Sequence, residues 1–248
     1  MLFNTDAYTA LPPRNGVPNS VRSRALVGRA KHRLAARMDD RGFRLGQPVF
    51  LRIFKNPRVL EVWLKRGDRF DLFESYLIQR FAGGPGPKIS DRDGQSPEGF
   101  YQVTRYRMNP YSFYHLGFNL GYPNAHDRGQ GWTGQSVMIH GKETSRGCYA
   151  MGDEAIEEIY ALCESALEAG QDSFSVQCLP FPLNSHNMQV VANHPWAAFW
   201  ATLEPGFRYF EEHRTPPAIG TMANGSYILE SAEPQARRFR GLGAVMRD

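Results

Sequence analysis

Length, composition and charge place this protein among ordinary globular domains. The chain has 248 residues, 42% of them hydrophobic and 22% charged, with a formal net charge of +4. The 24 glycines and 17 prolines are spread along the chain, which favours a loop-rich β architecture over a helical bundle. The sequence has no apolar run of membrane-spanning length, no signal-peptide core in its first thirty residues, and no HExxH, P-loop or GxGxxG motif.

Positive charge is concentrated at the N-terminal end. Up to Arg44 there are nine Lys or Arg residues against three Asp residues, or +6, so the remainder carries −2. Ser20 is a suitable N-cap for an amphipathic helix that Gly42 would end. Such a basic arm can lie on an anionic surface such as lipid head groups, nucleic acid or wall polymer, and a solvated helix face explains it equally well.

The middle of the chain reads as β-structure. Residues 49–54, 60–65 and 70–77 alternate between two faces and are separated by short turns, which predicts an antiparallel meander. Residues 82–99 contain so many turn formers that we expect a loop, followed by a strand over 100–107.

Further along, a short apolar strand over 136–139 ends at His140. Residues 153–168 have acidic residues in the first turn and one apolar face, so they predict a helix, and 174–179 predict a strand. Pro195 is expected at the first position of a helix whose aromatic residues Trp196, Phe199 and Trp200 pack on the body. The last fifteen residues are expected to be loosely ordered.

Together these elements predict a mainly β fold with peripheral helices (α+β), arranged as a sandwich or partly open barrel. Three parts are expected: a basic arm over 1–45, a catalytic domain over 46–182, and a helical extension with a tail over 183–248.

One segment combines the residues of thiol chemistry. The predicted strand delivers His140, a turn of small residues follows, and Gly147 precedes Cys148 just before the predicted helix. A thiolate is the reactive species, and a nearby imidazole can take the thiol proton and return it to a leaving amine. The other thiols, Cys163 and Cys178, form no CxxC pair; Cys163 falls on the apolar helix face, and whether the two pair is open.

The line from His140-Gly141 through Ser145-Arg146-Gly147-Cys148 resembles the signature of the L,D-transpeptidase (YkuD-like) family, closest to its YafK-like branch. The resemblance extends over about residues 47–228. Further blocks that carry it are Leu60-Glu61-Val62-Trp63, Gly86-Pro87-Lys88, Ser96-Pro97-Glu98-Gly99-Phe100-Tyr101, Phe118-Asn119-Leu120-Gly121-Tyr122-Pro123-Asn124 and His194-Pro195-Trp196.

The resemblance implies cysteine acyl transfer on peptidoglycan, without metal or organic cofactor. Cys148 would attack the carbonyl of the L-centre of meso-diaminopimelate in a stem peptide, and His140 would be its base. Backbone N–H groups around Arg146, Gly147 and Cys148 would hold the oxyanion. The acyl group would pass to an amine, giving transpeptidation, or to water, which would trim stem peptides or release a wall-attached protein. This substrate implies a periplasmic or other envelope location. We expect no transmembrane segment and no nucleic-acid partner.

One departure from the family pattern concerns the residue before the Gly-Cys pair. Many members have His there, whereas this chain has Arg146, which can instead meet a substrate carboxylate. The acceptor, amine or water, is therefore left open.

A second group of residues is expected to line the cleft because the blocks that hold them resemble the family. These residues are Tyr114, Asn119, Tyr122, Arg128, Gly141 and Ser145. His126 reads as a surface-loop residue. Three other functions stay open: a cysteine peptidase of ordinary proteins, a non-enzymatic binding module with a structural Cys148, and nucleic-acid binding by the basic arm.

Overall fold

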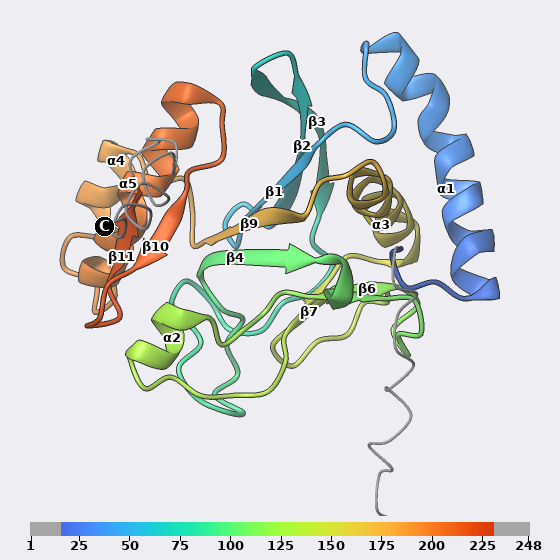
Figure 1. Cartoon of the computed structure of the whole chain (residues 1–248). Helices are drawn as coiled ribbons and strands as arrows, with labels where there is room; N and C mark the ends of the chain where they lie inside the picture. Colours follow the sequence, from blue (N-terminus) through green and yellow to red (C-terminus); the bar gives the residue numbers. More distant parts are fainter. Residues whose placement is uncertain (1–15, 231–248) are drawn as a thin grey trace, which may run out of the picture.

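The computed structural model describes residues 16–230, which form two main β-sheets and a separate two-stranded hairpin, β10-β11, with helices around them (Figure 1). The expectations for residues 1–15 and for the last fifteen residues lie outside this range. The helices are α1 (Val21–Asp40), α2 (Ala125–Gly129), α3 (Asp153–Glu168), α4 (Ser185–Val190) and α5 (Ala197–His213). The strands are β1 (Val49–Phe54), β2 (Val59–Arg66), β3 (Arg69–Leu77), β4 (Gly99–Thr104), β5 (Met108–Asn109), β6 (Gly117–Asn119), β7 (Met138–His140), β8 (Tyr149–Ala150), β9 (Ser173–Leu179), β10 (Ile219–Thr221) and β11 (Tyr227–Leu229).

The larger sheet has the strand order β3-β2-β1-β9-β4. Strands β1, β2 and β3 form the predicted antiparallel meander, β9 runs parallel to β1, and β4 is an edge strand antiparallel to β9. Strand β1 is buried along its whole length because both of its faces are covered. Phe50 and Phe54 pack toward α5, and Leu51 packs into the core shared with α1 and α3.

The smaller sheet has the order β5-β6-β7-β8 and shares that core. Phe118 of β6 meets Phe174 of β9 edge-to-face at 5.5 Å, so the two sheets pack against each other, and neither closes into a barrel within residues 16–230. The predicted α+β class is therefore confirmed. The predicted strand over 100–107 is too long, because β4 ends at Thr104 and residues 105–107 form a 3-10 turn.

Helix α1 begins and ends where the sequence predicts. The Ser20 hydroxyl accepts the backbone N–H of Ser23 at 3.0 Å, and the Ser23 hydroxyl accepts that of Ser20 at 2.7 Å. Its apolar face packs beside α3 at the edge of the molecule (Figure 1). Its basic residues pair with glutamates of α3: Arg33 lies 2.8 Å from Glu157, and Lys31 lies 3.9 Å from Glu164. Part of the arm's positive charge is therefore used inside the molecule.

The C-terminal region differs from its prediction in detail. Pro195 is not at the first helical position, since α5 begins at Ala197 with Trp196 as its N-cap, and α4 was not predicted. The aromatic residues still pack on the body: Trp200 is fully buried, and Trp196 and Phe199 lie against the same cluster.

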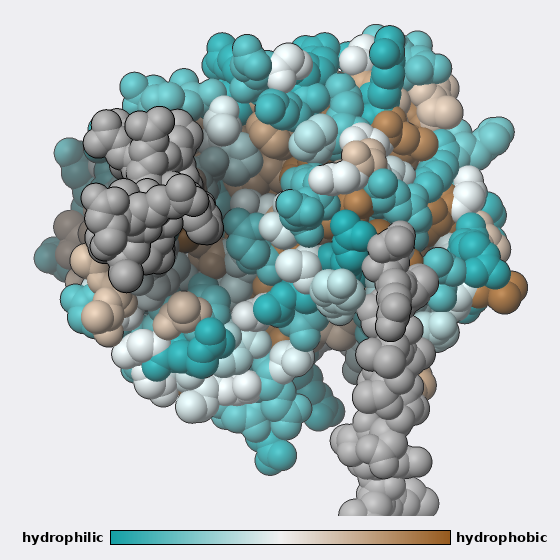
Figure 2. All heavy atoms as spheres, viewed as in Figure 1, coloured by the Kyte–Doolittle hydropathy of each residue, from teal (hydrophilic) through white to brown (hydrophobic). Residues whose placement is uncertain are grey.

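The face seen in Figure 2 carries hydrophobic residues in small, separated patches among hydrophilic ones. None of the helices in the described range is both long enough and apolar enough to cross a bilayer.

Candidate active site

Pairing of the two short strands β7 and β8 brings Cys148 beside the strand that ends at His140. The strands are parallel, with Ile139 opposite Tyr149 and His140 opposite Ala150. One residue earlier, Cys148 lies opposite Met138, whose backbone N–H donates to the Cys148 Sγ at 3.3 Å. Because side chains alternate along a strand, this register puts His140 and Cys148 on the same face, two positions apart.

The predicted place of Cys148 just before a helix is wrong. Strand β8 and two further residues separate Cys148 from Asp153, where α3 begins, so no helix N-terminus acts directly on the thiol. Cys148 is half-buried, and burial raises the pKa of its thiol. The N–H of Met138 and the positive charge of Lys88 oppose this rise. At neutral pH the resting side chain is therefore a thiol.

His140 is held in one tautomer. Its ring is 2% exposed, and Nδ1 lies 2.5 Å from the carbonyl oxygen of Gly141. A carbonyl oxygen only accepts, so Nδ1 carries the proton and Nε2 of the neutral ring is the free base. Burial lowers the pKa of His140, which keeps the ring neutral. The hydrogen bonds within residues 16–230 do not include one between His140 and Cys148, and catalytic hydrogen bonds are often long before substrate binds.

Two predicted site residues support the imidazole. Tyr114 packs against the His140 ring at a tilt of 37°, with a centroid distance of 4.5 Å, and is itself 47% exposed. Gly141 is enclosed: a Cβ there would lie 2.7 Å from Asp153 Oδ1 and 2.8 Å from the Tyr114 carbonyl. A side chain at position 141 would therefore displace the carbonyl that orients His140.

The turn before Cys148 is held by hydroxyl groups. Ser145 Oγ donates to the Cys148 carbonyl at 2.6 Å and accepts the Gly147 N–H at 3.1 Å. Ser96 Oγ reaches the same carbonyl at 3.3 Å from the 82–99 loop. The prediction that the Gly147 N–H holds the oxyanion does not fit this state, because Ser145 occupies that donor. Arg146 is exposed, with no ion pair inside the described range.

A buried ion pair anchors the loop that bears Ser96 and Lys88. Lys55 Nζ lies 3.1 Å from Glu98 Oε1 and donates to the Gly86 carbonyl at 2.7 Å, and both charged side chains are fully buried. The Glu98 carboxylate accepts two further hydrogen bonds. The Gly86 N–H donates to Oε1 at 2.7 Å, and the Trp200 indole N–H donates to Oε2 at 2.8 Å. The sequence carries no sign of a role for Lys55, Lys88, Ser96 or Glu98, because the burial of polar and charged residues leaves no periodic pattern. Lys88, Ser96 and Glu98 do lie in the blocks that resemble the family.

The other predicted lining residues fall into two groups. Asn119 of β6 lies opposite Met138 of β7, the strand that ends at His140, and Tyr122 is buried with its hydroxyl 3.1 Å from the Lys88 carbonyl. Arg128 does not join them, because it is exposed on α2 and lines a different cavity. The surface-loop prediction for His126 is wrong: it is 3% exposed and stacks on Tyr227 at 4.0 Å.

The remaining thiols are structural. Cys163 and Cys178 are both free and fully buried, so the predicted core position of Cys163 is confirmed and the two do not pair. In the part of the chain that the structure describes, no three His, Cys, Asp or Glu side chains come together as metal ligands.

Comparison with known proteins identifies relatives. The family profile described as the YkuD L,D-transpeptidase catalytic domain matches residues 56–178. Proteins from two strains of Escherichia coli that carry the provisional name L,D-transpeptidase YafK are each 42% identical over 185 residues, or 75% of both chains. A mutant of the helical cell shape determining protein Pgp2 of Campylobacter jejuni is similar in structure, with a TM-score of 0.45 and 20% identity. That match covers 77% of this chain and 65% of the Campylobacter chain.

Proposed function

This chain belongs to the L,D-transpeptidase family, and from that premise we propose that it is a cysteine acyltransferase of peptidoglycan with Cys148 as nucleophile and His140 as base. Its substrate is the stem peptide, at the carbonyl of the L-centre of meso-diaminopimelate. The observation that carries the proposal is the fixed tautomer of His140, which leaves Nε2 basic on the face shared with Cys148.

Catalysis begins from a neutral pair, because burial disfavours both the thiolate and the imidazolium. His140 Nε2 takes the thiol proton as Sγ bonds to the carbonyl carbon, and the carbonyl oxygen becomes an oxyanion. When the intermediate collapses, the C–N bond breaks and the imidazolium returns its proton to the leaving amine. An amine or water then attacks the thioester carbonyl carbon while His140 takes that nucleophile's proton. The C–S bond breaks, and His140 returns the proton to Sγ, which regenerates the neutral pair.

The oxyanion is held by the backbone N–H groups of Arg146 and Cys148. The Gly147 N–H is engaged by Ser145 Oγ in the resting state, which fixes the turn and aims its neighbours. The exposed Arg146 guanidinium is free of ion pairs within residues 16–230 and meets a carboxylate of the substrate.

Transfer to an amine is the primary assignment, and hydrolysis by the same acyl-enzyme is the alternative. Hydrolysis would trim stem peptides or release a wall-attached protein bound through diaminopimelate. Either reaction has its substrate in the cell envelope, so we place the working protein in the periplasm or envelope.

The experiment is mass spectrometry of muropeptides that contain meso-diaminopimelate, incubated with the protein and with Cys148→Ala, with and without an added D-amino acid. Cross-linked or exchanged products from the wild type alone support transpeptidation. Shortened products without exchange assign the hydrolase. Identical spectra from both proteins, on free and on protein-linked muropeptides, would overturn the Cys148 mechanism.

A further inference from the structure

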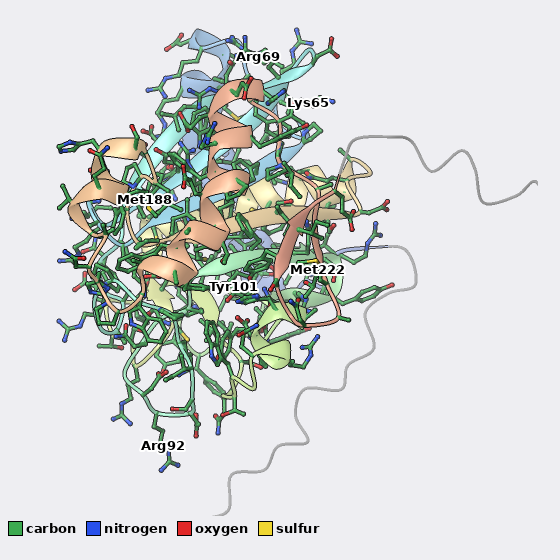
Figure 3. The ribbon with its side chains drawn as sticks, turned by 90° about the vertical axis from the view of Figure 1, so that its left-hand side faces the viewer. Lys65, Arg69, Arg92, Tyr101, Met188 and Met222 are labelled. Carbon is green, nitrogen blue, oxygen red and sulfur yellow. The ribbon has the colours of Figure 1, made fainter. Side chains whose placement is uncertain are left out.

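A cavity of about 280 Å³ lies on the α5 side of the larger sheet, lined by residues with no role in the Cys148 chemistry. Its floor is the edge strand β4 and its neighbour β9, where Phe100 lies opposite Gln177 and Gln102 opposite Ser175. The segment around β10 and β11 forms another wall through Pro217, Ile219 and Tyr227. Figure 3 shows α5 beside the β10-β11 hairpin, which carries Met222, on this side of the molecule.

The hairpin that closes this cavity is firmly docked. His126 of α2 stacks on Tyr227, and its Nδ1 donates to the Gly225 carbonyl at 2.5 Å. Asn124 donates to the Tyr227 hydroxyl at 2.9 Å and to the Phe100 carbonyl at 2.8 Å. The cavity walls are therefore held by specific contacts to the sheet and to α2.

Gln177, one of the lining residues, has an unsatisfied polar atom. Its side chain is 1% exposed, Nε2 reaches only the Gly206 carbonyl at 3.4 Å, and Oε1 has no hydrogen-bond partner in residues 16–230. A buried amide oxygen without a partner is unfavourable, so a ligand N–H donor that reaches it would form the missing hydrogen bond.

Two guanidinium groups supply positive charge to the same cavity. Arg107 is half-buried and packs over Gly121, where a Cβ would lie 2.6 Å from Nη1. Gly121 also has φ +93°, so both its backbone conformation and the nearby guanidinium disfavour a side chain there. Neither Arg107 nor Arg128 has a carboxylate partner in the described part of the chain.

We propose that this cavity binds a small organic carboxylate that also carries an N–H donor and an apolar body, of the size of an amino acid or dipeptide. The carboxylate meets Arg107 and Arg128, whose forked donors match it, and the N–H meets Gln177 Oε1. The apolar body lies against Phe100, Pro217 and Ile219. Inorganic phosphate fits less well, because it has no apolar part and its oxygens would face the Gln177 carbonyl.

Isothermal titration calorimetry of the full chain with the dipeptide alanyl-phenylalanine tests the site. We expect saturable binding that weakens about tenfold or more in Arg107→Gln, in Gln177→Leu, and with the C-terminal amide of the same dipeptide. Arg92→Gln is the matched control, because Arg92 is 90% exposed on a loop away from the cavity (Figure 3). Cys148→Ala should bind as the wild type does, which separates this site from the proposed catalytic one.

Three results would overturn the inference: no saturable binding in the millimolar range, equal binding by wild type and Arg107→Gln, or competition by inorganic phosphate as strong as that by the dipeptide. Thermal unfolding of Gln177→Leu checks that this variant folds, and Arg107→Gln tests the site independently of it.

Discussion

The two main sheets of this molecule are held in place in different ways. The larger sheet has strands of six to nine residues joined by continuous backbone ladders and covered by α5 on one face and by α1 and α3 on the other. The smaller sheet, which carries His140 and leads into Cys148, has strands of two or three residues. Its geometry depends on side chains that bond to backbone carbonyls, such as Ser145, Ser96 and Tyr149. Damage to the first sheet should therefore lower stability, and damage to the supports of the second should lower activity.

The largest expected loss of stability comes from the buried pair that ties the larger sheet to the 82–99 loop. Lys55→Met leaves the Glu98 carboxylate buried without its cation, and we expect the free energy of unfolding to fall by about 3–5 kcal/mol. Urea denaturation measures this. Lys65→Met on β2 is the control, expected within about 0.5 kcal/mol. Equal stability of the two variants would show that the loop is not anchored by this pair.

At Ser145 we expect a large loss of activity and only a small loss of stability. Ser145→Ala removes the hydrogen bonds to the Cys148 carbonyl and the Gly147 N–H, so the turn shifts and kcat/KM falls about 10- to 100-fold. Stability should fall by only about 1 kcal/mol.

Steady-state kinetics and thermal unfolding, both measured on Ser145→Ala, compare the two losses. Ser75→Ala is the control, because Ser75 is exposed. A variant that unfolds readily yet keeps full activity per folded molecule would contradict this prediction.

The pH dependence of the rate tests whether catalysis begins from a neutral Cys148 thiol and a neutral His140 ring. His140 must be unprotonated to act as base, so kcat/KM rises with pH through the His140 pKa, which burial holds below its usual 6.5. We expect the rate to level off by about pH 7. If a preformed thiolate were required, the raised pKa of Cys148 would make the rate climb beyond pH 8 instead. A profile of kcat/KM from pH 4.5 to 9 distinguishes the two cases.

The smallest effect is expected at the interface of α1 and α3. Arg33→Gln removes partly exposed ion pairs to Glu157 and Glu158, so the unfolding free energy should fall by about 1 kcal/mol or less, and less in high salt. Activity should not change. Denaturation at two salt concentrations measures this, and a loss of several kcal/mol would show that the charges of α1 matter more than its apolar face.

The sequence predicted the parts whose signals are local. The meander, the Ser20 cap and the helix over 153–168 follow from periodicity and capping, and a short motif pointed to Cys148 and His140, which the structure places on neighbouring segments. The place of Cys148 before β8, the use of the Gly147 N–H by Ser145, and the burial of His126 were not predictable in this way. Each depends on contacts between segments far apart in the chain, as does the cavity that joins Arg107 to Gln177.

The most direct test of the account is the mass of the protein after brief incubation with a muropeptide that contains meso-diaminopimelate, followed by acid quenching and peptide mapping. We predict an added acyl group on the peptide that contains Cys148, absent from Cys148→Ala and greatly reduced in His140→Ala. Turnover by the wild type with no adduct on Cys148, or turnover by Cys148→Ala, would contradict the proposed mechanism.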